Sequence, residues 1–375
     1  MRIIILHASA GHGHAKAAEA VKEGFARCGV ADSEVTVLDA LQETPAWFRK
    51  GYTSSYYFSV KHLPQVWGSA YALMDQDWFY DSIGARIRKF VNDFAAERLV
   101  RRMAGEAPEA IVCTHFLSPE VIGRAKIRGR LNSRLITVVT DFMPHRFWIN
   151  PGTDHYWVMS EEGKRALESR AVPSNKITAG GIPISLKFRP QNKKPEARRK
   201  EGLEADRFTL LITSGSFGLG PTEELMKTLR EFGERIQAIV VCGKNQDLLQ
   251  ALEKESYPFR LRLYGFVSHM DELMEASDLV IAKPGGATTS ECLAKGVPMV
   301  VVEPIPGQEA GNAGLLKERN AAFFLSEPGD IRVILKGILD YPGVLIEKQN
   351  CIRRLAKPDA AVDLARFVLH QIKEP

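Results

Sequence analysis

The chain has 375 residues, 45% hydrophobic and 25% charged, which predicts a globular protein of about two domains and excludes a disordered or collagen-like chain. The net charge of +5 is mild and no long basic tract is present, which argues against a nucleic-acid binder. Five widely spaced cysteines without a CxxC pair argue against a disulfide scaffold and favour a reducing cytoplasm. No run reaches the roughly 18 apolar residues of a membrane-spanning helix, so any membrane contact is expected to be peripheral.

The first half of the chain alternates short apolar runs with longer amphipathic stretches. We expect buried strands at residues 3–6, 110–113, 135–140 and 156–159, and helices at 15–27 and 82–103. Short apolar runs suit strands that are buried on both faces, and the periodic stretches suit helices that cover them. This alternation predicts a parallel sheet with helices on both sides.

The second half repeats the pattern. Strands are expected at 209–213, 238–242, 261–264, 279–282 and 299–302, with helices at 223–232, 271–276 and 290–294 and a closing amphipathic helix at 360–372. Two rounds of alternation predict an α/β protein with two Rossmann-like, doubly wound domains. We place the first domain at residues 1–188 and the second at residues 206–354.

A basic segment separates the two predicted domains. Residues 187–200 read KFRPQNKKPEARRK, with two prolines, no apolar periodicity and seven basic residues against one acidic residue. We interpret residues 189–205 as a basic linker. It is either a solvated connector or a basic stripe beside a membrane, and the sequence leaves both open.

Residues 45–90 break the α/β pattern. They hold 12 of the 32 aromatic residues, and Arg86, Arg88 and Lys89 lie close by. Tryptophan and tyrosine favour membrane interfaces, and neighbouring cations suit anionic head groups. The segment is therefore either an aromatic-rich core subdomain or a membrane-facing surface, and the two interpretations are compatible.

Histidines and small residues follow the first predicted strand, in the segment HASAGHGHAKAAEAV. Gly11 and Gly13 permit a tight turn into a helix whose N-terminal N–H groups would lie at the carboxyl edge of the sheet, where ligands bind in such folds. His14 falls in the first helical turn, where an imidazole can serve as a general base or hydrogen-bond a ligand. His12 shares the turn, but no third ligand is close in sequence, so we expect no metal site.

Three more polar residues follow predicted strands of the first half. His115 comes shortly after the strand that ends at Cys113, Asp141 follows the next strand, and His145 comes four residues later. A carboxylate at a strand end acts as a base, orients an imidazole, or is only a turn or helix-cap residue. The sequence leaves these roles open.

Glycines and hydroxyl side chains follow two strands of the second half. After residue 213 the chain reads SGSFGLGP, a loop whose N–H groups would face a diphosphate unless it is a plain turn. After residue 282 it reads KPGGATTSE, which places Gly285 and Gly286 before a hydroxyl-rich helix start, with Glu291 one turn inside. These residues suit phosphates and ribose hydroxyls, and Gln308 and Glu309 of the following EPIPGQEAG suit sugar hydroxyls.

Together these motifs resemble a known family. SAGHGHAKAAEA, VVTDFMPHRFW, GFVSHMDELMEASDLVIAKPGG and PGQEAGN occur in this order over most of the chain. They resemble the inverting glycosyltransferases of the monogalactosyldiacylglycerol synthase type, with bacterial processive diacylglycerol glucosyltransferases as close relatives. The resemblance implies a GT-B architecture, in which two Rossmann-like domains face an interdomain cleft, and a C-terminal helix within residues 355–375 that packs back on the first domain.

The resemblance also implies roles for particular residues. His14 would be the base and Asp141 would assist it, although the additional His12 leaves the base open between His14 and Asp141. The acceptor would be contacted by Gly11, Gly13, His115 and His145. The donor would be contacted by Ser214, Gly215, Gly218, Phe266, Val267, Gly285, Gly286, Thr288, Thr289, Glu291, Gln308 and Glu309. Neither a metal nor a cofactor is implied, because the UDP-sugar is a substrate.

The function that follows is transfer of a hexosyl group from a UDP-sugar to diacylglycerol or a similar membrane lipid. The enzyme would be cytoplasmic, bound peripherally to an anionic surface at the inner face of the cell membrane, and would bind no nucleic acid. The alternatives are another lipid-linked or soluble acceptor, a nucleotide-sugar 2-epimerase, or a catalytically silent nucleotide-binding module. If His14 is the base, activity should fall on the acid side near the ordinary histidine pKa of about 6.5. The identity of the sugar, processivity and oligomeric state stay open.

Overall fold

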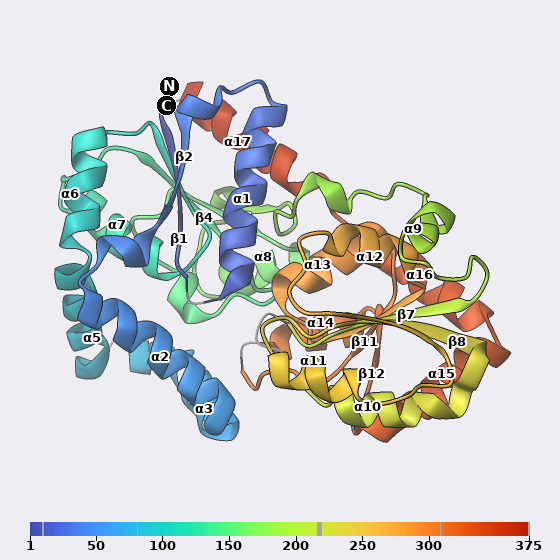
Figure 1. Ribbon diagram of the computed structural model, residues 1–375. Helices are drawn as coiled ribbons and strands as arrows, with labels where there is room; N and C mark the ends of the chain where they lie inside the picture. Colours follow the sequence, from blue (N-terminus) through green and yellow to red (C-terminus); the bar gives the residue numbers. More distant parts are fainter. Residues whose placement is uncertain (10, 81, 216–219, 308, 374–375) are drawn as a thin grey trace. The chain divides into compact units, whose positions relative to one another are not determined.

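The computed structural model describes residues 1–375 except 10, 81, 216–219, 308 and 374–375 (Figure 1). The chain forms two compact units, and the first is assembled from three separate segments. Unit 1 consists of Met1–Leu186, Ile305–Asn312 and Asp359–Pro375, and unit 2 consists of Lys187–Pro304 and Ala313–Pro358.

Unit 1 is built on a six-stranded parallel sheet in the order β2-β1-β3-β4-β5-β6. Its strands are β1 (Ile3–His7), β2 (Val35–Asp39), β3 (Ala110–Cys113), β4 (Arg134–Val138), β5 (His155–Val158) and β6 (Ile177–Ala179). Its helices are α1 (His12–Arg27), α2 (Ala46–His62), α3 (Pro64–Met74), α4 (Asp77–Tyr80), α5 (Ile83–Ala95), α6 (Glu97–Glu106), α7 (Leu117–Ile127), α8 (Glu161–Glu168) and α17 (Ala360–Lys373).

The side chains of β1 alternate between two cores of unit 1. Ile4 and Leu6 pack with residues of α6 and α7 on one face, whereas Ile3 and Ile5 pack with α1 and α17 on the other. Because successive strand residues point to opposite faces, a strand that is apolar throughout is explained by helices on both sides. The prediction of a doubly wound α/β unit is confirmed here.

Helix α17 lies directly against α1, far from it in sequence (Figure 1). A Cβ atom on Gly24 of α1 would lie 2.1 Å from the backbone oxygen of Ala361. The two helix backbones therefore approach each other too closely for any residue other than glycine at position 24. The end of the chain in this way completes one face of the sheet at which the chain begins.

Unit 2 contains the second six-stranded parallel sheet, in the order β12-β11-β10-β7-β8-β9. Its strands are β7 (Phe208–Thr213), β8 (Ile236–Val241), β9 (Arg260–Tyr264), β10 (Leu279–Ala282), β11 (Met299–Val301) and β12 (Ala322–Phe324). Its helices are α9 (Lys194–Lys200), α10 (Thr222–Leu229), α11 (Gln246–Glu253), α12 (Met270–Ala276), α13 (Gly286–Lys295), α15 (Ile331–Asp340) and α16 (Gly343–Leu355); α14 (Ala310–Glu318) begins in the last residues of the 305–312 segment.

The sequence did not reveal three strands, which are β2, β6 and β12. Each lies at an edge of its sheet or is only three residues long, and their side chains are mostly half-buried. The apolar run that marks a doubly buried strand is therefore missing from them. The predicted helix at 82–103 is divided into α5 and α6 at Ala96, whose backbone leaves the helical region.

Part of the segment interpreted as a basic linker, residues 189–205, is helical. Residues 194–200 form α9, in which the side chain of Arg198 is buried. Its guanidinium donates to the Ala276 oxygen (2.9 Å) and is paired with Asp278, which also accepts from Lys194. Tertiary ion pairs stabilise this short helix, and such pairs leave no apolar periodicity in the sequence.

Candidate active site

The chain changes direction at one point of the unit 1 sheet, between β1 and β3. The connection from β1 leads to the edge strand β2, whereas β3 lies on the other side of β1. Ligands of open α/β sheets bind at such a point, outside the carboxyl ends of the strands. The β1–α1 turn with His14 and the turn after β3 with Thr114 and His115 meet there.

The backbone angles at positions 11 and 13, where α1 begins, do not require glycine. Gly11 is extended, with φ of 167°, and Gly13 lies within α1. Neither is in the left-handed region. The expected tight glycine turn is therefore an ordinary extended-to-helical transition, and the contribution of the two glycines is their lack of side chains at the start of α1.

The His14 ring is held by two contacts to neighbouring strand ends. Its Nδ1 lies 2.8 Å from the backbone oxygen of Thr114 and 2.9 Å from Oγ1 of Thr140. A carbonyl oxygen only accepts, so Nδ1 carries the proton and Nε2 of the neutral ring is the basic nitrogen. Burial lowers the pKa of His14 to about 4, which keeps the ring neutral at physiological pH.

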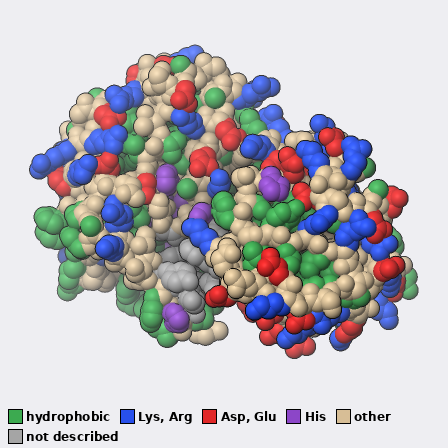
Figure 2. Space-filling view, viewed as in Figure 1, with side chains coloured by type: hydrophobic (Ala, Val, Ile, Leu, Met, Phe, Trp, Pro, Cys, Tyr) green, Lys and Arg blue, Asp and Glu red, His purple; other side chains and the backbone are tan. Residues whose placement is uncertain are grey.

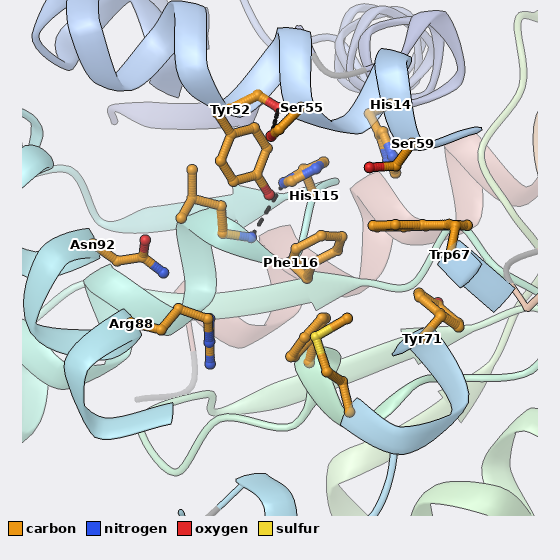
Figure 3. A pocket seen from close by; sticks show the side chains of 13 residues that line it. His14, Tyr52, Ser55, Ser59, Trp67, Tyr71, Arg88, Asn92, His115 and Phe116 are labelled. Carbon is orange, nitrogen blue, oxygen red and sulfur yellow. Dashed lines mark hydrogen bonds between the residues drawn. The ribbon is translucent and has the colours of Figure 1, made fainter. Parts of the chain in front are cut away.

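An apolar cavity of about 350 Å³ lies beside His14 within unit 1 (Figure 3). Helices α2, α3 and α5 form one side of it, and the turns after β3 and β4 form the other. Its lining residues are His14, Tyr52, Ser55, Ser59, Trp67, Tyr71, Met74, Arg88, Asn92, His115, Phe116, Leu117 and Phe147. Most of these are aromatic or aliphatic, so the cavity suits a largely apolar ligand.

His115 forms part of the wall between His14 and the aromatic residues. Its ring is buried, meets the His14 ring edge to face at 4.6 Å between centroids and stacks on Phe116 at 4.2 Å. Nδ1 accepts from the Leu117 N–H at 3.2 Å. Burial and the neighbouring His14 hold the pKa of His115 well below its usual range. His115 is therefore a neutral ring that borders the cavity.

Asp141 is buried and lies outside the cavity lining. Its carboxylate accepts from Nε1–H of Trp148 at 2.9 Å. Burial raises the pKa of Asp141 to about 6, with the Trp148 hydrogen bond opposing the shift and the charge of Glu309 adding to it. The carboxylate changes charge close to neutral pH, as is common for acid–base groups at functional sites.

His145, which was expected to contact an acceptor, lies next to the cavity lining. Nε2 lies 2.9 Å from the Tyr71 backbone oxygen, and Nδ1 accepts from the Phe147 N–H at 3.1 Å. Asp75, which Arg170 binds through both guanidinium ends at 2.7 Å, lies 3.6 Å from Nε2. Nε2 of His145 thus joins the turn after β4 to α3, and Nδ1 stabilises that turn itself, beside the cavity rather than within its lining.

Sequence reasoning missed most of the cavity. Tyr52, Trp67 and Tyr71 lay in the aromatic segment 45–90, which was interpreted as core or as membrane surface, and they line the cavity. Arg88 and Asn92 are four residues apart on α5, a spacing that puts them on the same helix face. That spacing of two polar residues is the signal that could have found this pair.

Unit 2 has its own change of direction, between β7 and β10, whose last residues Thr213 and Ala282 are register partners. The turns after these two strands therefore leave the sheet side by side. Gly285 is the N-cap of α13 and Gly286 its first residue, so the unpaired N–H groups of this helix lie at the carboxyl edge. This is an arrangement that binds phosphate groups.

The predicted donor residues differ in accessibility. Phe266 is 60% exposed after β9, Val267, Thr288 and Glu291 are half-buried, and Gly215 has a positive φ of 67°. Ser214 is buried and shares a hydrogen bond with Thr222, and Thr289 is fully buried in the first turn of α13. Gly218 and Gln308 lie outside the described residues.

Glu309 belongs to the segment that is grouped with unit 1, although the expected second domain included it. One of its carboxylate oxygens accepts from the Ile305 N–H at 2.8 Å. In the same segment Asn312 Oδ1 accepts from the Phe142 N–H at 2.8 Å, and Gly307 lies against the ring of Tyr71. Residues 305–312 therefore pack beside α3 and the turn that carries Asp141.

Among the described residues, no group of three or more His, Cys, Asp or Glu side chains is arranged to hold a metal ion. Over the same residues, no helix is long and apolar enough to cross a membrane.

Solved structures with similar folds define the class of protein. MurG from Acinetobacter baumannii matches with a TM-score of 0.64 and 18% identity over 98% of this chain and 99% of its own. A UDP-GlcNAc 2-epimerase from Neisseria meningitidis, bound to UDP-GlcNAc, matches with a TM-score of 0.61 and 13% identity over 99% and 100% of the two chains. The fold is therefore that of the GT-B class, which transferases and epimerases share.

The family models distinguish between these two activities. Residues 14–184 match the model of monogalactosyldiacylglycerol (MGDG) synthase, and residues 209–328 match that of the glycosyltransferase family 28 C-terminal domain. A processive diacylglycerol beta-glucosyltransferase from Bacillus thuringiensis strain Al Hakam is 27% identical over 99% of this chain and 94% of its own length. The chain is a glycosyltransferase, and its residues 14–184 are similar to the MGDG synthase type, as the motifs had indicated.

Proposed function

We propose that this protein is an inverting glycosyltransferase that moves a hexosyl group from a UDP-sugar to diacylglycerol. The observation that carries the proposal is the position of His14. Its Nδ1 is bound to the Thr114 oxygen, so the basic Nε2 belongs to a ring that borders an apolar cavity. A general base beside an apolar acceptor pocket is what glycosylation of a neutral lipid alcohol requires.

In the proposed reaction, Nε2 of His14 removes the proton from the acceptor hydroxyl. The oxygen attacks C1 of the sugar from the face opposite the diphosphate, the new C–O bond forms, and the bond to UDP breaks. The electron pair leaves with UDP, and the configuration at C1 is inverted. Asp141 assists through its charge. Its carboxylate interacts electrostatically with Glu309 and so changes the electrostatic potential at that segment. No metal or cofactor takes part in this proposal.

The donor site proposed in unit 2 uses the two turns that leave β7 and β10. The N–H groups at the start of α13, beginning at Gly286, bind the diphosphate, and Thr288 adds a hydroxyl. Glu291, one turn inside the helix, accepts from the ribose hydroxyls. Phe266 and Val267 contact the uracil base.

The membrane surface proposed for unit 1 is the outer face of α5. Ile83, Ile87, Phe90 and Phe94 are 60–76% exposed and follow one another at intervals of four, three and four residues. Figure 2 shows hydrophobic side chains gathered over this part of unit 1. Exposed apolar residues in one stripe, with Arg86 exposed beside them, suit a helix that rests in the interface of an anionic bilayer.

The structure changes the cation set expected at this surface. Arg88 is not an exposed cation, because it lines the cavity and is paired with Glu120 at 2.7 Å. The membrane test therefore replaces Phe90 and Phe94 with serine and measures sedimentation with vesicles containing phosphatidylglycerol. We expect a clear loss of bound protein. Equal sedimentation of variant and wild type would exclude α5 as the docking surface.

The test of function incubates the full-length protein with UDP-glucose or UDP-galactose and diacylglycerol in mixed micelles. We expect glycosyl-diacylglycerol and UDP in equal amounts from one of the two donors. A soluble or other lipid-linked acceptor remains the alternative, and UDP release only with such an acceptor would favour it. Conversion of UDP-GlcNAc to its 2-epimer without any acceptor would identify an epimerase.

A further inference from the structure

The cavity beside His14 has a second polar place, formed by Arg88 and Asn92 of α5. Figure 3 shows both side chains on the same side of the cavity, apart from His14. The residues between these two places, including Tyr52, Phe116 and Leu117, are aromatic or aliphatic. A ligand that fills the cavity thus meets a base at one place and hydrogen-bond donors at another.

Glu120 of α7 contacts both residues of this second polar place, Arg88 and Asn92. Its side chain is 2% exposed and accepts from Asn92 Nδ2 at 2.8 Å and from Arg124 at 3.3 Å, and it pairs with Arg88 at 2.7 Å. The Arg88 guanidinium also lies over the Phe147 ring, 4.9 Å from its centre. A planar guanidinium fixed by a buried carboxylate and an aromatic face keeps one orientation.

Arg88 belongs to a group of three guanidiniums and two carboxylates. Arg88 and Arg124 pair with Glu120, and Arg124 and Arg128 pair with Asp93 at 2.6 and 3.1 Å. The Arg88 guanidinium lines the cavity, and a guanidinium only donates hydrogen bonds. Because the lining around it is largely aromatic or aliphatic, this place suits the neutral acceptor atom of an apolar ligand.

The size of the cavity selects the part of a lipid that fits. A volume of about 350 Å³ is at the lower end for small-molecule sites, enough for a glycerol unit with its two ester groups but not for two long acyl chains. The helices that form this wall, α2, α3 and α5, carry exposed apolar residues such as Phe58, Val66 and Ile87 on the outside. The acyl chains would continue along that surface.

We infer that Arg88 is a specificity-determining residue that donates to an ester carbonyl of a neutral acylglycerol, with Asn92 beside it, so that the free hydroxyl of the glycerol points to Nε2 of His14. Glu120 is the positioning residue that orients both. The inference rests on the proposed function and adds to it the chemical feature by which the acceptor is recognised, which is the ester carbonyl rather than the acyl chain.

The test compares dioleoylglycerol with its dialkyl ether analogue, which has the same hydroxyl and similar chains but no carbonyl. For the wild-type protein we expect kcat/KM about 10- to 100-fold higher for the diester, as for one hydrogen bond to a charged donor. Arg88→Met should lower kcat/KM for the diester by a similar factor, chiefly through KM, and leave the ether almost unchanged. Arg88→Lys should restore part of the preference.

Glu120→Gln should reduce the preference while keeping the volume of the side chain. The matched control is Arg101→Gln on α6, whose guanidinium is 77% exposed and paired with Glu97 outside the cavity lining. Stabilisation by UDP, measured as the shift in Tm, reports the folding of every variant. If the wild type uses diester and ether equally, or if Arg88→Met lowers both equally, the inference is wrong although the proposed function stands. If no lipid is glycosylated, the proposed function itself fails.

Discussion

The two units use the same position in two similar sheets for different chemistry. In unit 1 the turns after β1 and β3 bring a histidine onto a backbone oxygen, whereas in unit 2 the turns after β7 and β10 present glycines and the start of α13. In unit 1 the functional group is the His14 side chain, and its contact with the Thr114 oxygen decides which ring nitrogen carries the proton. The second exposes backbone N–H groups, whose partial charge is independent of pH.

The difference shows how one architecture divides a two-substrate reaction. In the proposed reaction, proton transfer depends on a single nitrogen, so it should be sensitive to one side chain and to pH. The proposed diphosphate binding is distributed over several N–H groups, so it should tolerate any single substitution. Substitutions in unit 1 and substitutions in unit 2 should therefore change different constants, kcat in the first case and UDP affinity in the second.

The largest effect is expected for His14→Ala. Removal of a general base typically lowers the rate by 10²–10⁴-fold, and the donor should still bind because it is held by other residues. We expect loss of kcat with UDP affinity unchanged, measured by steady-state kinetics and calorimetry. His12→Ala, in the same turn, is the control and should retain activity. The opposite result for the two histidines would reverse the assignment.

A smaller effect on a different constant is expected for Glu291→Ala in unit 2. Loss of hydrogen bonds from ribose hydroxyls to a charged acceptor should weaken UDP about 10- to 100-fold. The exposed Glu234, elsewhere in unit 2, provides the matched control Glu234→Ala. UDP affinity within a factor of about two of the wild type would rule out the ribose role.

The pH profile of kcat/KM separates the two candidate bases. The pKa of His14 is about 4 and that of Asp141 about 6, the reverse of their ordinary order, because both are buried. If His14 is the base, activity should persist below pH 6 and fall by half near pH 4, not near the 6.5 expected from the sequence. If kcat/KM instead falls by half near pH 6, and this fall is absent in Asp141→Asn, the Asp141 carboxylate is the base.

The smallest effect is a gain in stability for Asp141→Asn. The pKa of Asp141 is about 6 in the folded protein against 3.8 for an ordinary aspartate, so the folded state binds a proton more tightly than the unfolded state. Its contribution to stability is full below pH 3.8 and is lost as pH rises through 6. Asp141→Asn should therefore raise the unfolding free energy by on the order of 1–3 kcal/mol at pH 7.5 and much less at pH 4. An equal change at both pH values would contradict this.

The sequence predicted the parts of the molecule that repeat a simple pattern. The buried strands β1, β3 and β10 are apolar for most of their length, and the segments after them carry His14, His115, Gly285 and Gly286, so the carboxyl edges of both sheets were found in advance. The edge strand β6 and helix α9 were missed, because their stability comes from neighbours distant in sequence. The cavity was missed for the same reason, since Arg88 and Glu120 meet only when α5 packs on α7.

The return of the chain to its starting point affects how the protein can be made. Ile3, Ile5 and Val21 share a core with Leu364 and Val368, so α1 alone covers this part of the first sheet until α17 has been synthesised. Synthesis begins at the N-terminus and domains usually fold as they emerge. The unit that is started first is therefore completed only after unit 2 has been synthesised, and we expect part of its apolar core to stay exposed until then.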